Sequence, residues 1–127
     1  DVFNLVQDTR VVLGSFAFMD TDFTADDAML SAKVGASEIS HAMSHELVFA
    51  EGSLDAIVAA CVKSAFFVMR ALRYAKTGEY PPSRAAMREL ATEQEAVFLD
   101  AYDNLDAFET GELAHALLTW SSSIVSL

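Results

Sequence analysis

The sequence is poor in several residue types, and each shortage limits what the chain can be. Cys61 is its only cysteine, so no disulfide can form within the chain, and a lone cysteine in an apolar segment suits a reducing cytoplasm, where we expect the protein to reside. With two prolines and five glycines, the sequence has no low-complexity tract, no internal linker and no glycine-rich loop to hold phosphate. We therefore expect a single domain over residues 1–127.

Long uninterrupted apolar runs are also missing. The longest apolar region, 54–72, contains Asp55, Lys63 and Arg70, and each of these charges is costly at the centre of a bilayer. This region is predicted to be a core helix, and no membrane partner is expected.

Positive charge is scarce, with 8 Lys and Arg against 19 Asp and Glu and a formal net charge of −11. Such a chain repels nucleic acid at long range unless its cations gather on one face, so direct binding of nucleic acid is not expected. An acidic, lysine-poor surface fits adaptation to high salt. It also fits attraction of a cationic ligand, such as an aminoglycoside, by carboxylates around Glu46, Glu51 and Glu89. Composition does not decide between the two.

Apolar residues recur at steps of three and four almost throughout the chain. This spacing predicts an all-α fold, an up-and-down bundle of four to five antiparallel helices. We expect the helices over about 2–19, from 24 to near 52, over 53–77, over 83–108, and from 110 to the C-terminus. The segment VVLGSFAFM in the first of these is the one place where a strand is also compatible with the pattern.

The ends of the middle helices are marked by particular residues. Thr24 with Asp27 three residues on has the spacing of a capping box, and Ser53 is placed to cap the third helix. Gly78 can adopt the left-handed conformation that closes a helix, and the prolines at 81 and 82 prevent continuation. The boundary between the third and fourth helices is therefore the best defined in the sequence.

Two Glu-x-x-His pairs, Glu38 with His41 and Glu112 with His115, match the ligand pattern of di-iron carboxylate bundles. At about 100° per residue, both pairs fall opposite the apolar stripes of their helices. The apolar stripes comprise Met29, Ala36, Ile39, Met43 and Leu47 on one helix, and Leu113, Leu117, Trp120, Ile124 and Leu127 on the other. Ligands on the outer faces do not converge inside a bundle, so no metal site is predicted and a di-metal bundle ranks third among the functions considered.

The third helix carries a stripe of positive charge. Its apolar face is predicted to comprise Ile57, Cys61, Ala65, Val68 and Leu72, and the other face to hold Lys63, Arg70 and Arg73 together with Phe66 and Tyr74. Six of the eight cations lie between residues 63 and 88. One interpretation is a site for an anionic group, in which Arg70 and Arg73 donate to phosphate and Tyr74 stacks on a base. The alternative is that these cations pair with acidic residues of neighbouring helices, such as Asp100, Asp103 and Asp106.

The sequence offers no catalytic constellation of its own. Ser121, Ser122 and Ser123 have no histidine at a motif spacing, and Cys61 has no partner nearby in sequence. We therefore do not expect this chain to be an enzyme by itself.

A family resemblance covers residues 53–90 most closely. The segment AACVKSAFF at 59–67, then MRALR at 69–73 and KTGEYPPSR at 76–84 resemble the helical C-terminal domain of nucleotidyltransferases of the kanamycin- and lincosamide-modifying kind, within the HEPN superfamily. The resemblance implies a bundle beside a catalytic nucleotidyltransferase domain, in the same chain or in a partner chain, that helps to form the substrate or nucleotide cleft and often a dimer interface. A divalent metal would then belong to the catalytic domain, and no cofactor is expected in this chain.

The sequence departs from HEPN ribonucleases, which carry an arginine followed within a few residues by histidine near this turn. No histidine lies between Arg70 and His115, so RNA cleavage is disfavoured. Because the first residue is Asp1 and not Met, the chain is interpreted as an excised or processed domain.

The function predicted from the sequence is a noncatalytic helical domain that binds a substrate or nucleotide through Lys63, Arg70, Arg73 and Tyr74 and forms a homodimer. The alternative is a stand-alone helical interaction module, antitoxin-like or dimerising, without a small-molecule site.

Overall fold

The computed structural model describes residues 3–4, 24–50 and 52–127. In these residues the fold is an all-α helical bundle, as predicted, built from α2 (Ala25–Phe49), α3 (Leu54–Thr77), α4 (Arg84–Leu90), α5 (Glu93–Asp103), the short 3₁₀ helix η2 (Leu105–Ala107) and α6 (Thr110–Val125). The expected helix over 2–19 and its possible strand lie outside the described residues, apart from Phe3 and Asn4, which are helical.

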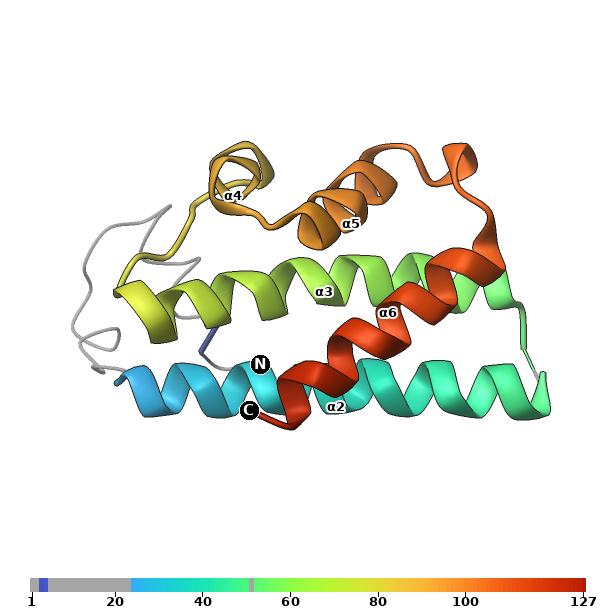
Figure 1. Cartoon of the computed structure of the whole chain (residues 1–127), viewed down its shortest axis with the longest axis horizontal. Helices are drawn as coiled ribbons and strands as arrows, with labels where there is room; N and C mark the ends of the chain where they lie inside the picture. Colours follow the sequence, from blue (N-terminus) through green and yellow to red (C-terminus); the bar gives the residue numbers. More distant parts are fainter. Residues whose placement is uncertain (1–2, 5–23, 51) are drawn as a thin grey trace.

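The two long helices α2 and α3 lie side by side and antiparallel (Figure 1). Thr24 and Asp27 form the predicted capping box at the start of α2, with the Thr24 backbone N–H donating to the Asp27 carboxylate over 2.9 Å. Ser53 caps α3, and Gly78 closes it in the left-handed conformation with φ of 76°. The predicted start of α2 and both predicted ends of α3 are thus confirmed, whereas α2 ends at Phe49, before the predicted end near 52, with Ala50 as its left-handed cap.

Small residues on α2 let α3 approach closely. Ala28, Ala32 and Ala36 are fully buried along the inner face of α2. Gly35 lies nearer still, because a Cβ placed on it would sit 2.7 Å from Cγ2 of Val68 on α3. The packing distance between the two helices therefore depends on a missing side chain.

The single helix predicted over 83–108 is wrong, because this segment forms α4, α5 and η2 in succession. The break falls at Ala91 and Thr92. Thr92 and Glu95 form a second capping box, which starts α5 in place of continuing α4. The spacing Thr-x-x-Glu was present in the sequence and marks this new start.

The helix α6 crosses α2 and α3 obliquely, and α4 and α5 lie on the side of α3 away from α2 (Figure 1). The buried residues of α6 include the predicted stripe of Leu113, Leu117, Trp120 and Ile124. Leu127 was predicted to join this stripe, but it lies beyond the end of the helix and is 60% exposed.

The central position of α3 changes which of its residues are buried. Cys61, Ala65, Val68 and Leu72 are buried as expected, but α3 also buries residues on the face predicted to be polar, Phe66 and Arg70 among them. Contacts on more than one side of α3 extend its buried surface beyond the predicted apolar face, although Lys63, Ser64 and Phe67 stay exposed. The basic stripe of α3 is therefore divided between buried and exposed positions.

Candidate ligand-binding site

Arg70, the centre of the predicted stripe, is only 3% exposed. Its Nε donates to the carbonyl oxygen of Pro81 over 2.8 Å. Its guanidinium carbon lies 4.1 Å from the centre of the Tyr80 ring and 4.8 Å from that of Phe66. These are the geometries of a charge-assisted hydrogen bond and of cation–π contacts, and they attach the loop after α3 to the helix.

Tyr74 lies in the same aromatic cluster as Arg70. Its ring meets that of Phe3 edge to face, with centroids 5.3 Å apart, and Phe3 also contacts Tyr80 at 5.9 Å. The hydroxyl of Tyr80 donates to Oδ1 of Asn4 over 2.8 Å. Arg70 and Tyr74 thus hold the described N-terminal residues and the α3–α4 connection against the core.

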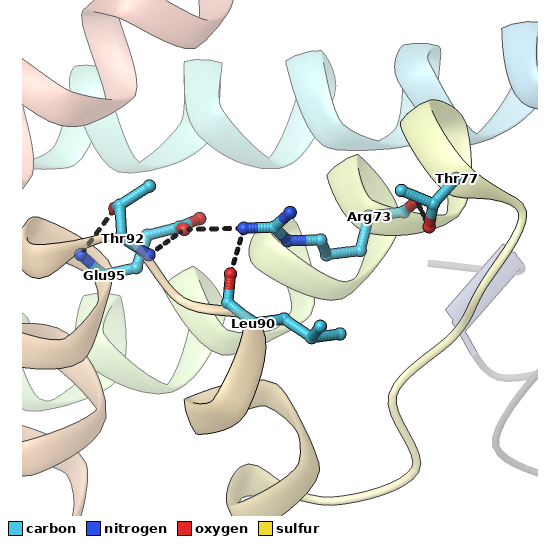
Figure 2. A network of polar contacts seen from close by, with 5 residues as sticks. All are labelled: Arg73, Thr77, Leu90, Thr92 and Glu95. Atoms are coloured by element: carbon cyan, nitrogen blue, oxygen red, sulfur yellow. Dashed lines mark hydrogen bonds and ion pairs between the residues drawn. The ribbon is translucent and has the colours of Figure 1, made fainter.

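Arg73 faces a different part of the molecule, toward the junction of α4 and α5. Figure 2 shows its guanidinium donating to the carbonyl oxygen of Leu90 and reaching the carboxylate of Glu95, at 3.8 Å. Glu95 is buried and also accepts from the backbone N–H of Thr92 over 3.0 Å. One carboxylate therefore caps α5 and pairs with a cation of α3, while the Arg73 side chain keeps 25% of its surface exposed.

The alternative that the cations pair with neighbouring acids is confirmed for several of them. Arg84 contacts Asp103 at 3.0 Å, and Arg88 contacts Asp100 and, at 3.5 Å, Asp103. These pairs join α4 to α5 on the surface, where each contributes about 1 kcal/mol or less. Glu46 is likewise engaged, because its carboxylate accepts from the backbone N–H of Gly52.

Two exposed lysines of α3 remain without an acidic partner among the described residues. These are Lys63, which belongs to the predicted site, and Lys76, three residues after Arg73. The structure does not bring Lys63 together with Arg73. Lys76 is one of the six cations between residues 63 and 88 but is not among the four predicted binding residues.

A pocket of about 660 Å³ lies between the C-terminal half of α3, the start of α5 and the end of α6. It is lined by Leu72, Arg73, Lys76, Thr92, Glu93, Gln94, Glu95, Trp120, Ser123, Ile124 and Leu127. Its volume falls within the range usual for small-molecule sites, roughly 300–1,000 Å³. Of the four predicted binding residues, only Arg73 lines it.

The chemistry of the pocket wall is mixed. Leu72, Trp120 and Ile124 supply an apolar side, and the Trp120 ring is held edge to face against Phe98 with centroids 5.2 Å apart. Two cations and two carboxylates line the rest, but the carboxylate of Glu95 already serves Arg73 and the cap of α5. Lys76 and Glu93 are thus the charged groups of the pocket that have no such contact with the other described residues. The wall suits a ligand with an anionic group, an aromatic or apolar part, and hydrogen-bond donors.

The histidines of the Glu-x-x-His pairs are exposed, and His41 lies on the outer face of α2 as predicted. Over residues 3–4, 24–50 and 52–127, no three or more His, Cys, Asp or Glu side chains are grouped so as to hold a metal ion. Burial raises the pKa of the Cys61 thiol to about 11, which keeps it protonated and unreactive at neutral pH.

None of the described helices has the length and apolar character needed to cross a membrane. Comparison of the chain with protein-family models, with curated proteins and with solved structures gives no match.

Proposed function

We propose that the chain is a noncatalytic helical binding domain of a nucleotidyltransferase-like protein, and that the pocket between α3, α5 and α6 holds a nucleotide or the group to be nucleotidylated. The observation that carries this proposal is the placement of Arg73, Lys76 and Trp120 on one pocket of about 660 Å³. The resemblance of residues 53–90 to such domains agrees with it.

Different residues of the pocket wall contact different groups of the ligand. Lys76 meets a phosphate group, and the exposed part of Arg73 adds a second positive charge beside it. The apolar side around Trp120 accepts a base or another planar group. Glu93 and Gln94 accept hydrogen bonds from hydroxyl or amino groups of the same ligand.

The pocket is partly open to solvent, and this lowers the affinity expected of the chain alone. A site that covers only part of its ligand binds weakly, because the remaining surface stays hydrated. In the proposal a catalytic nucleotidyltransferase domain, in the same chain or in a partner, supplies the missing wall together with any divalent metal. This chain alone then binds with a Kd in the high micromolar to millimolar range, on the order of −4 to −6 kcal/mol.

The test is calorimetric titration of ATP, without metal, into the chain and two variants. Lys76→Gln removes the unpaired positive charge of the pocket and is expected to weaken binding about tenfold, since a hydrogen bond to a charged group contributes about 1.5–3 kcal/mol. Lys63→Gln removes another exposed lysine of the same helix, outside the pocket, and is expected to leave Kd unchanged.

The reverse result locates the site elsewhere. If Lys63→Gln weakens binding and Lys76→Gln does not, the ligand binds near Lys63 and not in the pocket. If the unmodified chain shows no heat with any nucleotide at millimolar concentration, the binding proposal fails.

An interaction module without a small-molecule site is the second candidate. The exposed apolar residues of α2 favour it: Leu30 is 63% exposed and Val48 is 73% exposed. A protein that associates through this face while failing to bind any nucleotide would support this alternative.

A further inference from the structure

The charged side chains that line the pocket between α3, α5 and α6 balance one another. The two cations are Arg73 and Lys76, and the two carboxylates belong to Glu93 and Glu95. The formal net charge of the pocket wall is therefore zero, whereas the whole chain carries −11. A ligand with several negative charges meets repulsion from the surrounding protein and no excess of positive charge inside the pocket.

Lys76 presents the one positive charge of the pocket wall that forms no ion pair with a carboxylate of the described residues. The guanidinium of Arg73 lies between the carbonyl oxygen of Leu90 and the carboxylate of Glu95, as Figure 2 shows. Only 25% of the Arg73 side chain is left exposed to face a ligand. The pocket can therefore neutralise one phosphate group well, but not a chain of three.

The start of α5 adds little positive potential to the pocket wall. Free backbone N–H groups at the N-terminus of a helix attract anions. In α5, Glu93 and Glu95 lie in this first turn, and their carboxylates offset that potential. Thr92 and Glu95 also bond to each other's backbone N–H groups in the capping box, over 3.0 Å and 3.2 Å. A polyphosphate therefore gains little at this end of the pocket.

The other polar groups that the pocket leaves for a ligand are mainly hydrogen-bond acceptors. The carboxylate of Glu93 forms no ion pair or hydrogen bond with the described residues. The side-chain nitrogen of Gln94 donates to the carbonyl oxygen of Ala116 over 3.5 Å, which leaves the side-chain oxygen as an acceptor. The hydroxyl of Ser123 donates to the carbonyl oxygen of Trp120 over 2.6 Å, and its oxygen can also accept. A matching ligand carries several N–H or O–H donors.

We infer that the pocket selects a nucleoside monophosphate with an amino group on its base over a nucleoside triphosphate. The inference rests on the proposed function and narrows its ligand to one class. The single phosphate contacts Lys76, and the base lies against the apolar side around Trp120. The ribose hydroxyls donate to the oxygens of Gln94 and Ser123, and the amino group of the base donates to the carboxylate of Glu93. Such a ligand uses both the cation and the acceptors of the pocket wall.

The number of phosphates is tested by calorimetric titration of AMP and of metal-free ATP into the unmodified chain. AMP is expected to bind about fivefold more tightly, because the additional charges of ATP meet no additional cation. The ratio of the two Kd values is expected to shrink between about 0.05 M and 0.5 M salt, since screening weakens the repulsion that ATP experiences more strongly. Binding of ATP that is tighter than that of AMP would overturn the inference.

The amino group is tested with purine riboside 5′-monophosphate, which differs from AMP only in lacking that group. The unmodified chain is expected to prefer AMP about tenfold, the loss usual for a hydrogen bond to a charged group. In Glu93→Gln the preference is expected to fall to about threefold or less, since a neutral amide oxygen is a weaker acceptor than a carboxylate. The readout is this preference, a ratio of two Kd values, because removal of a carboxylate also strengthens the attraction of the pocket for any phosphate.

Glu112→Gln is the matched control for Glu93→Gln. Glu112 is an exposed carboxylate near the start of α6, whereas the pocket is lined by the end of that helix. The change removes the same charge outside the pocket, and the preference for AMP is expected to persist. Both variants are first checked for unchanged helical content by circular dichroism. A preference that survives Glu93→Gln, or that Glu112→Gln reduces equally, would overturn the contact between the amino group and Glu93.

Failure of this inference gives a different result from failure of the proposed function. If neither AMP nor ATP binds at millimolar concentration, the proposed function fails and the inference fails with it. If ATP binds more tightly than AMP and Lys76→Gln weakens both, the pocket stands and the inference about its ligand is wrong. Tighter binding of AMP, with a preference for the amino group that depends on Glu93, supports both.

Discussion

Replacing Arg70 with alanine separates a structural role from a ligand-binding role for the central cation of α3. The substitution removes the hydrogen bond from Nε to the Pro81 carbonyl and the contacts of the guanidinium with Tyr80 and Phe66. A hydrogen bond to a charged group contributes about 1.5–3 kcal/mol, and a desolvated cation–π contact about 2 kcal/mol. We expect Arg70→Ala to lower the free energy of unfolding by about 4 kcal/mol, a large part of the 5–15 kcal/mol typical of a domain.

Urea unfolding followed by circular dichroism measures this loss. With a slope of about 2 kcal/mol per molar urea, the midpoint is expected to fall by about 2 M. Arg70→Lys is expected to lose about half as much stability, because an ammonium group keeps the charge but lacks the planar face that stacks on the rings. An unchanged midpoint in Arg70→Ala, together with loss of ATP binding, would refute the structural role and return Arg70 to the ligand site.

Two further predictions concern the core. Gly35→Ala is expected to destabilise the chain by about 1 kcal/mol in urea unfolding, since overpacking against Val68 costs about 1–3 kcal/mol and outweighs the roughly 1 kcal/mol gained in helix propensity. In a Val68→Ala background the same change should be stabilising, and destabilisation there would contradict the close approach. Native Cys61 should resist iodoacetamide at pH 8. Because its pKa rises from 9.0 to about 11 on folding, the unfolded thiol ionises first, and the free energy of unfolding should fall between those pH values. Equal labelling of native and unfolded chains would contradict its burial.

Local signals in the sequence were sufficient for most helix boundaries. The capping box at Thr24, the cap at Ser53 and the left-handed Gly78 each act within one turn of the chain, so their effect can be read without knowledge of the fold. The missed break before α5 is of the same local kind. Periodicity continued across Thr92 and concealed a capping box that the spacing to Glu95 would have revealed.

The location of the candidate site depended on tertiary packing and could not be predicted in the same way. A helical projection assigns each residue to a face but does not say how many faces are covered. Arg70 is buried beneath the connection between α3 and α4, where it contacts Pro81 and Tyr80, while Arg73 reaches a pocket between α3, α5 and α6. Trp120 joined that pocket from α6, 44 residues beyond Lys76 in the chain, a contact that no spacing rule indicates.

Fluorescence of Trp120 gives the most direct test of the proposed pocket, because it is the only tryptophan in the chain and it lines the site. Titration of ATP with excitation at the red edge of tryptophan absorption is expected to give a saturable change in emission with the same Kd as calorimetry. The Kd from this titration is expected to be about tenfold higher for Lys76→Gln. Saturable binding by calorimetry with no change in Trp120 emission would contradict the account, because the ligand would then bind away from this pocket.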